Sequence, residues 1–432
     1  MIRNVIEHTK KILNSLEKLD LLEINYSGSN FSTFRKPNNK IINIIFSILS
    51  FILKQVVKDI FSIFKRKKIK NKNILFYNSA NQYNALLPIH KKLDKTVWVT
   101  LKYNKDITIP MSFGCIISLL LTSRFIRQLT RKYKNEKDLI LNNVLDYYFI
   151  EGMYIWWSFY LYIKKPRCII FSNDHLVWHR VLRIAAQVNN IPTVYLQHAS
   201  VTNKFPKLEF DLSLLEGEDA FKKYAEKKIY GNVKLVGMPK FDKYYSNINK
   251  NSKIHTIGIC TNLLDDEILI ETFCKGIRSY FDKLNIILRP HPRDFRYNFY
   301  QQIKTKYSLQ LSDSTKENSF EYLDKVDINI AGETSIHLEA ALLNVYPIYF
   351  QFRDEITDHY GFIKNKLITD VFDKIDVLVS FLYEIMNKKP NIRERAKFYV
   401  ESVNSEYDGK SIELAKKNIE NYLKNEINIT FE

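Results

Sequence analysis

The sequence predicts an α/β fold of two Rossmann-like domains that face each other across a cleft, with a helical extension in front of them. Strand-like apolar runs alternate with helical segments from residue 73 onward, and the alternation restarts near residue 254 after a polar linker. Such alternation is typical of parallel β-α-β units. At 432 residues the chain exceeds what one hydrophobic core usually fills, which also favours two domains.

The elements follow from the chain in order. In the first half, strands are expected within 73–79, 95–103, 167–174, 191–200, 210–219 and 233–239, and helices within 80–93 and 175–190. In the second half, strands are expected within 254–262, 285–292, 308–313, 326–335 and 345–352, and helices within 265–284 and 336–344. The predicted units are a helical segment over 1–70, domains over 71–246 and 252–385, and C-terminal helices over 386–432.

Composition narrows the class of protein. The net charge of +18 suits anionic partners, namely a membrane surface or phosphorylated substrates, although a generally Lys-rich composition explains part of it. RGG runs and low-complexity RNA-binding segments are absent from the sequence, so no nucleic-acid partner is expected. The four cysteines lie far apart without a Cys-x-x-Cys pair, which favours a reducing compartment over a disulfide framework or a zinc site.

The N-terminal region bears on location. Residues 1–20 have the pattern of a charged amphipathic helix and not of a signal peptide, which predicts a cytoplasmic protein. The segment Ile41–Lys70 holds 13 uncharged residues before Lys54 and ends near the basic cluster Lys65–Lys68. A bilayer span needs roughly 20 apolar residues, so an in-plane helix on an anionic membrane is the favoured interpretation. A helix packed on the protein's own core is the alternative.

A strand end with an unusual loop is the first candidate site. The run "NIILRPHPRDF" ends a strand in Arg289-Pro-His291-Pro-Arg293. The two prolines restrict the backbone around His291, and the two arginines suit an anion such as a departing phosphate. The alternative is a solvated turn with incidental charges.

A second strand end lies about 40 residues further on. In "INIAGETSIHLEAALLN" the chain passes from a strand into a helix at Glu333, Thr334 and Ser335. Backbone N–H groups and two hydroxyls there would hold a phosphate, and Glu339, one turn later, would accept bonds from ribose hydroxyls. Ordinary helix capping by Thr334 or Ser335 is the alternative.

These motifs resemble those of bacterial glycosyltransferases of the GT-B type, over roughly residues 165–350. They look most like the enzymes that use CMP-activated sugars, the sialyl-, polysialyl- and Kdo transferases of capsule and lipopolysaccharide assembly. "VYLQHASVTNKF" is similar to the Gln-His-Gly stretch of capsule and CDP-glycerol transferases, with Ala199 in place of glycine. The resemblance implies that His291 assists departure of the phosphate and that Thr334 and Ser335 hold it.

The resemblance also implies a general base from the first, acceptor-binding domain. Glu216 before Gly217 is a partial match to the acidic motif that supplies it, because Leu215 stands where a second acid is usual. Asp174 is the second candidate, since "FSNDHLVWHR" ends a strand just before Asn173, Asp174 and His175. Asp174 as a helix cap is the alternative. Asn173, His175 and His198 are expected to contact substrate, although a structural role is equally open for His198.

Two further candidate sites lie at the end of the strand expected within 254–262 and just after it. Asp265-Asp266 is more typical of a helix start than of a metal site, so no catalytic metal and no cofactor are expected. Thr261-Asn262, just before that pair, is a candidate donor contact.

The function predicted from these sites is metal-independent, inverting transfer of a sugar from a nucleotide donor, CMP-linked by preference, to a surface glycan or glycolipid at the inner face of the bacterial membrane. Capsule-assembly proteins are possible partners. The alternatives are a CDP-glycerol-type polyol-phosphate transferase, a UDP-sugar 2-epimerase-like enzyme and a non-catalytic basic scaffold on the membrane.

Overall fold

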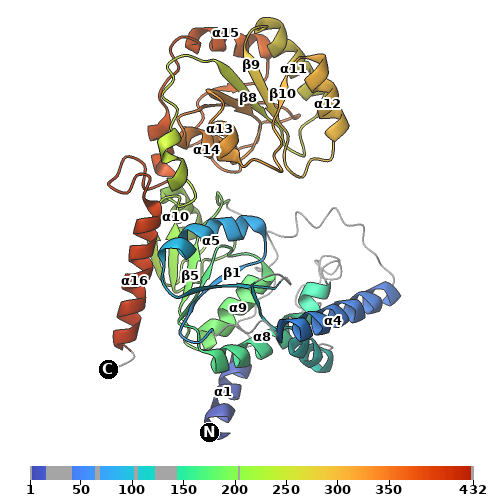
Figure 1. Cartoon of the computed structure of the whole chain (residues 1–432), viewed down its shortest axis with the longest axis vertical. Coiled ribbons are helices and arrows are strands. Elements are labelled where there is room, and N and C mark those ends of the chain that lie inside the picture. Colours follow the sequence, from blue (N-terminus) through green and yellow to red (C-terminus); the bar gives the residue numbers. More distant parts are fainter. Residues whose placement is uncertain are drawn as a thin grey trace.

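A computed structural model describes residues 2–15, 41–63, 69–101, 106–121, 144–202 and 205–429. Figure 1 shows two α/β domains, one above the other, with the C-terminal helix running back along the lower one. Each domain is built on a parallel sheet, and helices precede the first sheet. The predicted fold class is therefore confirmed.

The first sheet has seven strands in the order β3-β2-β1-β4-β5-β6-β7, all parallel. They are β1 (Asn73–Tyr77), β2 (Thr96–Thr100), β3 (Ile107–Thr108), β4 (Cys168–Phe171), β5 (Thr193–Leu196), β6 (Leu212–Leu215) and β7 (Asn232–Leu235). Most of these strands are buried on both faces, which explains their nearly continuous apolar sequences.

Helices cover both faces of this sheet. One core contains Ile74 and Phe76 of β1 together with residues of the helices α1 (Ile2–Asn14), α8 (Val144–Lys164), α9 (Val177–Val188) and α10 (Glu218–Ala225). The opposite core contains Leu75 and Tyr77 together with residues of α5 (Ala80–Lys92) and α16 (Ser411–Ile429). The alternation along β1 follows from the two-residue period of a strand.

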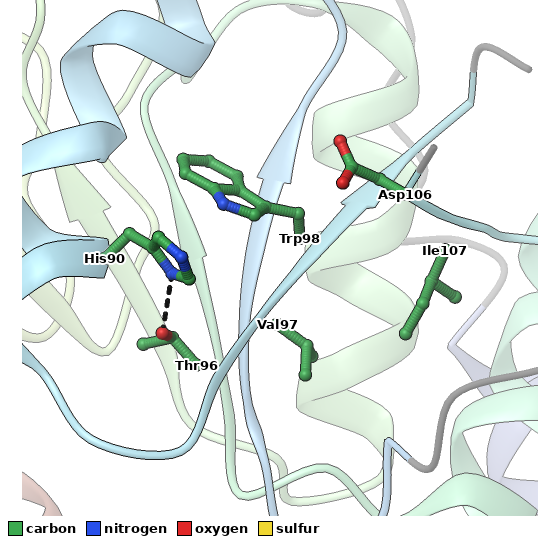
Figure 2. A pocket seen from close by; sticks show the side chains of 6 residues that line it. All are labelled: His90, Thr96, Val97, Trp98, Asp106 and Ile107. Carbon is green, nitrogen blue, oxygen red and sulfur yellow. Dashed lines mark hydrogen bonds between the residues drawn. The ribbon is translucent and has the colours of Figure 1, made fainter. Parts of the chain in front are cut away.

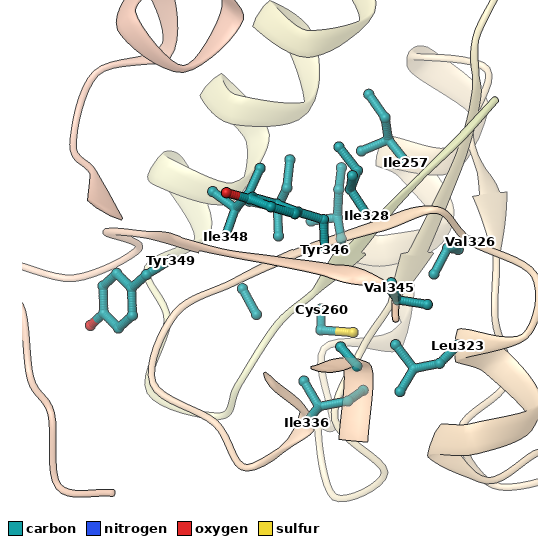
Figure 3. Close-up of a cluster of buried hydrophobic side chains, with 14 of the residues drawn as sticks. Ile257, Cys260, Leu323, Val326, Ile328, Ile336, Val345, Tyr346, Ile348 and Tyr349 are labelled. Atoms are coloured by element: carbon teal, nitrogen blue, oxygen red, sulfur yellow. The ribbon is translucent and has the colours of Figure 1, made fainter. Parts of the chain in front are cut away.

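The second sheet repeats the same plan with six parallel strands in the order β10-β9-β8-β11-β12-β13. They are β8 (Thr256–Cys260), β9 (Asn285–Arg289), β10 (Gln310–Leu311), β11 (Ile328–Ala331), β12 (Tyr346–Phe350) and β13 (Val371–Phe372). The helices are α11 (Glu267–Tyr280), α12 (Tyr297–Lys306), α13 (Ser319–Leu323), α14 (Ile336–Leu342) and α15 (Ile375–Ile385). Figure 3 shows part of their apolar core, where Ile257, Ile328 and Ile348 come from adjacent central strands.

The chain passes between the domains twice, and the two crossings are tied together. The 3-10 helix η3 (Asp242–Asn247) lies in the first crossing, and η4 (Arg393–Phe398) lies on the way back. The Asp242 carboxylate accepts the backbone N–H groups of Ser411 at 2.9 Å and Ile412 at 2.7 Å, so it caps the start of α16. Arg393 and Asp408 form a two-pronged ion pair at 2.7 and 2.6 Å.

The two sheets fall inside the ranges predicted for the two domains, but α16 is not an independent C-terminal unit. It packs against α5, and Ile419 and Leu423 are buried in the first domain's core. The division of the chain at 71–246 and 252–385 stays a prediction.

The membrane segment predicted over Ile41–Lys70 contains one long helix, α4 (Ile41–Ile63). Among the described residues, no helix combines enough length with enough apolar character to cross a bilayer. The basic cluster Lys65–Lys68 lies outside the described residues. All four cysteines are buried and unpaired.

Candidate active site

The candidate residues gather at the carboxyl ends of strands, where open α/β sheets bind their ligands. In the second sheet, β8 and β11 lie side by side although they are not consecutive in sequence, so the strand order reverses between them. Thr261 and Asn262 follow β8, Thr334 and Ser335 come shortly after β11, and His291 follows β9 on the other side of β8. Neighbouring strands lie roughly 4.8 Å apart, so the ends of β9 and β11 are about 10 Å from each other.

His291 is half-buried, and its tautomer is set by a backbone contact. Its Nδ1 accepts the backbone N–H of Arg293 at 3.1 Å. Burial, and after it the charge of Arg293, lowers the pKa of His291. The neutral ring that results carries its proton on Nε2, which makes that atom a hydrogen-bond donor. A hydrogen-bond donor at Nε2 can stabilise the negative charge on a departing phosphate.

A network that sequence reasoning missed holds the His291 loop in place. The Arg296 guanidinium donates to the carbonyls of Asp265 at 2.7 Å and Asn262 at 3.0 Å, and to the Asp294 carboxylate at 2.7 Å. Tyr300 donates to Asp294 at 2.8 Å, and its hydroxyl lies 2.9 Å from that of Thr261. The loops after β8 and β9 are therefore joined. Thr261 is buried and supports this network, and its contact with the donor stays a prediction.

The two arginines beside His291 differ. Arg289 is buried, and its guanidinium donates to Ser312 Oγ at 2.7 Å and the Glu317 carbonyl at 2.9 Å. These two donors have protein partners in the structure, and the predicted contact of Arg289 with an anion stays a prediction. Arg293 is exposed, and within the described part of the chain its guanidinium makes no hydrogen bond or ion pair.

Thr334 and Ser335 leave their hydroxyls largely unused. Ser335 is the N-cap of α14 but makes no side-chain capping bond, and Thr334 Oγ1 accepts the N–H of Ile336 only at 3.5 Å. Ordinary helix capping, the alternative interpretation, therefore does not explain why these two hydroxyl residues stand at the start of α14. Both side chains are half-buried beside the strand-order reversal.

Glu333 and Asn262 have structural partners here. The Glu333 carboxylate accepts the backbone N–H of His359 at 2.6 Å, and His359 Nδ1 lies 3.0 Å from its other oxygen. The Asn262 amide donates to the Glu333 carbonyl at 3.0 Å. The Glu333 carboxylate therefore anchors the segment containing His359, and the substrate contact expected of this side chain stays a prediction.

Glu339 belongs to a charged cluster between the domains. Lys240, in the crossing, donates to Glu339 Oε1 at 2.8 Å. Glu216, at the end of β6, is buried, and burial raises its pKa to about 7, against the opposing effect of Lys240 and with a contribution from Glu339. The carboxyl end of the first sheet therefore meets the helix that follows β11. Lys240 thus pairs with one Glu339 oxygen, and the ribose contact expected of Glu339 stays a prediction.

Glu216 is held from the first domain by a glutamine. Gln197 Oε1 accepts the Glu216 backbone N–H at 2.8 Å, and Gln197 Nε2 lies 3.4 Å from Glu216 Oε2. Glu216 Oε1 is buried and has no hydrogen-bond partner among the described residues. Sequence analysis named Glu216 but not Gln197 or Lys240, although Gln197 directly precedes His198 in the quoted motif.

Asp174 and His175 form a carboxylate–imidazole pair after β4. Asp174 Oδ1 lies 2.9 Å from His175 Nδ1, and Asp174 Oδ2 accepts the Tyr224 hydroxyl at 2.6 Å. Burial alone would raise the pKa of Asp174, but the bonds from His175 and Tyr224 outweigh it and hold that pKa below its usual value. The Asp174 side chain is 0% exposed and that of His175 is 21% exposed. His175, not Asp174, is therefore the member that a substrate can reach.

Asn173, rather than Asp174, makes the turn into the next helix. Its Oδ1 accepts the backbone N–H groups of His175 at 3.2 Å and Leu176 at 2.7 Å. Its amide nitrogen lies 3.2 Å from His175 Nε2, which identifies Nε2 as an acceptor when Nδ1–H donates to Asp174. Asn173 therefore orients His175.

The neighbouring histidines are held neutral. Burial, with Lys240 and His175 adding to it, lowers the pKa of His198 to about 4, and its Nδ1 is buried without a partner. Burial likewise lowers the pKa of His179 to about 3, and its Nε2 lies 3.2 Å from Gln82. His198 is thus a neutral imidazole beside the interdomain cluster.

The acidic pair after β8 is structural. Asp266 caps α11 by accepting the backbone N–H groups of Ile268 and Leu269, and Asp265 pairs with Arg353 at 3.0 Å. Over the described ranges, no group of three or more His, Cys, Asp and Glu side chains is arranged to hold a metal ion.

A cavity of about 160 Å³ lies elsewhere, along the edge of β2 in the first domain. Figure 2 shows its lining, with His90 hydrogen-bonded to Thr96 at 2.7 Å and Trp98 beside them. It contains none of the predicted site residues.

Comparison with known proteins supports the architecture. No protein-family model and no curated protein matches the chain. A solved UDP-N-acetylglucosamine 2-epimerase matches at 10% identity with a TM-score of 0.50, over 80% of this chain and 94% of that one. The UDP-GlcNAc 2-epimerase from Neisseria meningitidis matches at 12% identity and 0.49, over 82% and 100%. The wall teichoic acid polymerase TagF matches at 13% and 0.46, over 88% and 98%.

Identities this low show the fold alone. The match with a TM-score of 0.50 agrees with the sheet orders, which show two parallel-sheet α/β domains in a GT-B-type fold. Its activity has to be argued from the site.

Proposed function

We propose that this protein is a glycosyltransferase that moves a sugar from a nucleotide-activated donor onto a bacterial surface glycan or glycolipid. The observation that carries the proposal is His291, whose Nδ1 accepts a backbone N–H and so leaves Nε2 as the donor atom, on a loop held by Arg296. The strand that precedes His291 ends about 10 Å from the end of β11, which Thr334 and Ser335 follow. Within the described residues, Ser335 makes no side-chain capping bond, and an anionic phosphate requires such available donors.

The step is a direct displacement. The acceptor hydroxyl oxygen forms a bond to the anomeric carbon, while the bond from that carbon to the phosphate oxygen breaks and its electron pair leaves with the nucleotide. His291 Nε2–H and the two hydroxyls stabilise the negative charge on the departing phosphate. One displacement inverts the anomeric configuration, and neither a metal nor a cofactor has a part in the scheme.

The acceptor's proton goes to His175 in this proposal. Its Nε2 is the unprotonated nitrogen, and the acceptor hydroxyl replaces the Asn173 amide there. Asp174 is a positioning residue that fixes the tautomer, in the manner of the orienting acid in hydrolase triads. Glu216 is the second candidate for the base, because its pKa of about 7 suits proton transfer at neutral pH.

The preference for CMP-linked donors rests on the resemblance of the His-Pro and Thr-Ser motifs alone. A panel of CMP-, CDP- and UDP-activated donors, each incubated with the purified protein and a glycan acceptor, tests the proposal. We expect acceptor-dependent nucleotide release together with a lengthened glycan, most rapidly from a CMP-sugar.

Other products would identify the alternatives. Glycerol phosphate transferred from CDP-glycerol would indicate a polyol-phosphate transferase, and a UDP-sugar changed only at carbon 2 would indicate an epimerase. No turnover of any donor by folded protein would leave the scaffold interpretation.

A further inference from the structure

Two neighbouring helices of the first domain present large apolar side chains to solvent. On α4 these are Phe46, Leu49, Leu53, Val57, Ile60 and Phe61. On the helix over 112–121 they are Phe113, Ile116, Leu119, Leu120 and Leu121, with Leu120 at 80% exposure. We call these eleven residues the two-helix apolar surface.

The two helices are tied to each other. The Asp59 carboxylate of α4 accepts the backbone N–H groups of Met111 at 2.8 Å and Ser112 at 2.7 Å, at the start of the second helix. Lys58 donates to the Leu101 carbonyl at 3.1 Å. The apolar side chains are thus carried by adjacent helices and not scattered over the molecule.

The opposite side of α4 already packs on the protein. Phe51 stacks on Phe149 with ring centroids 4.7 Å apart, and Ile48, Phe51 and Ile52 pack against the first domain's core. The exposed apolar side chains of α4 therefore lie on the side of the helix that faces away from the core. Figure 1 shows α4 at the side of the first domain, away from the second.

An exposed apolar surface of this size indicates that a membrane or another molecule covers it. Fully burying one large apolar side chain is worth about 1.5–3 kcal/mol, and monomeric soluble proteins rarely leave large contiguous apolar patches in water. A partial burial of these eleven side chains would still outweigh the cost of immobilising the protein at an interface.

Charge indicates which occupant. The sequence after α4 contains Lys65, Arg66, Lys67 and Lys68, and the sequence after the second helix contains Arg124, Arg127, Arg131, Lys132 and Lys134. Both basic runs lie outside the described residues. An apolar helix continued by basic residues is typical of attachment to an anionic membrane, because acyl chains take the apolar side chains and anionic headgroups attract the cations.

We propose that the two-helix apolar surface docks the protein in the plane of an anionic lipid bilayer. The proposal is independent of the activity proposed above. The membrane contact expected for Ile41–Lys68 is thereby extended to a second helix, which sequence analysis did not predict. In this arrangement α4 packs on the core with one side and contacts lipid with the other.

Vesicle co-sedimentation of the full chain tests it. The variant Leu53→Asp/Leu120→Asp places one carboxylate on each helix at exposed positions, so the fold is kept. The matched control is Val377→Asp, an exposed apolar residue on α15 of the second domain. We expect wild type and the control to bind phosphatidylglycerol-containing vesicles far better than pure phosphatidylcholine vesicles. The double variant should bind them at least about tenfold more weakly.

Several results would overturn the proposal. These are unchanged binding by the double variant with an intact circular dichroism spectrum, equal wild-type binding to both vesicle types, and absence of wild-type binding. A concentration-dependent wild-type dimer that the double variant abolishes in light scattering would assign the surface to a second copy of the chain instead.

Discussion

At the scale of single residues, the Asp174–His175 pair decides how the first domain takes part in chemistry. Because the buried Asp174 carboxylate accepts the Nδ1–H of His175, the Nε2 atom carries no proton and can accept one. The pair was recognisable as acidic and basic residues at a strand end. Which of the two residues accepts the proton could not be recognised from the sequence. It depends on Tyr224, which lies 50 positions away in the sequence and donates to the second Asp174 oxygen.

Asp174→Asn should therefore lower kcat on the order of 100- to 10,000-fold with little change in KM. The amide nitrogen of asparagine donates to Nδ1, which moves the proton to Nε2 and removes the acceptor. Steady-state kinetics of nucleotide release measure both constants. Tyr224→Phe, which removes one bond to Asp174 but keeps its charge, should cost much less. Equal losses in the two variants would indicate a packing effect and contradict the positioning role.

Glu216 permits a test of electrostatics by stability. Its folded-state pKa of about 7 lies above the ordinary value of 4.5, so the folded protein holds this proton more tightly than the unfolded chain. The resulting stabilisation is complete below pH 4.5 and is lost as pH rises through 7. At pH 8 the buried carboxylate is ionised and destabilises the fold.

Glu216→Gln cannot ionise, so it should raise the free energy of unfolding at pH 8 by on the order of 1–3 kcal/mol and change it little at pH 5. Urea unfolding at the two pH values measures the difference. Glu218→Gln, two residues away and with a side chain that is 40% exposed, is the control and should show no such pH dependence. A variant that is no more stable than wild type at pH 8 would refute the assigned pKa.

At the scale of elements, the sequence was informative where strands are buried. The runs around β1, β4, β5, β8, β9, β11 and β12 were predicted because burial on both faces demands uninterrupted apolar residues. The strands β3 and β13 were missed, since each pairs over only two residues and leaves no pattern. The helix α8 was missed because its aromatic-rich sequence has little helical periodicity.

The packing of α16 was beyond prediction, since nothing in its own sequence states which domain it covers. Its docking on α5 makes the first domain depend on the last residues of the chain. Ile419→Ala, at a fully buried position, should lower the first domain's free energy of unfolding by about 2–5 kcal/mol.

Tryptophan fluorescence can follow this change in one domain. All four tryptophans, Trp98, Trp156, Trp157 and Trp178, lie in the first domain, so their emission reports its unfolding alone. The exposed Lys424→Ala on the same helix is the control. An Ile419→Ala transition that coincides with wild type would show that α16 contributes nothing to the first domain's stability.

At the scale of the whole molecule, the two sheets bring together what the sequence holds apart. Glu216, Lys240 and Glu339 come from the first domain, the crossing and the second domain. Their meeting follows from how the crossings pack, where Asp242 caps α16 and Arg393 holds Asp408. A single sequence reveals strand ends, and thus most of the site's candidates, but not which charges neutralise one another across a domain boundary. The protein partners of Arg289, Glu333 and Glu339 were therefore not predicted, and contact of these residues with substrate stays a prediction.

The account stands on His291 as the hydrogen-bond donor to the departing phosphate, and its removal tests that claim most directly. The measurement is kcat for nucleotide release by His291→Ala with the preferred donor at saturation. Loss of one preorganised donor to a developing charge should lower kcat about 100- to 1000-fold. His255→Ala, an exposed histidine at the amino end of β8 and so at the opposite edge of the same sheet, should keep wild-type turnover. Near-normal kcat in folded His291→Ala protein would contradict the account.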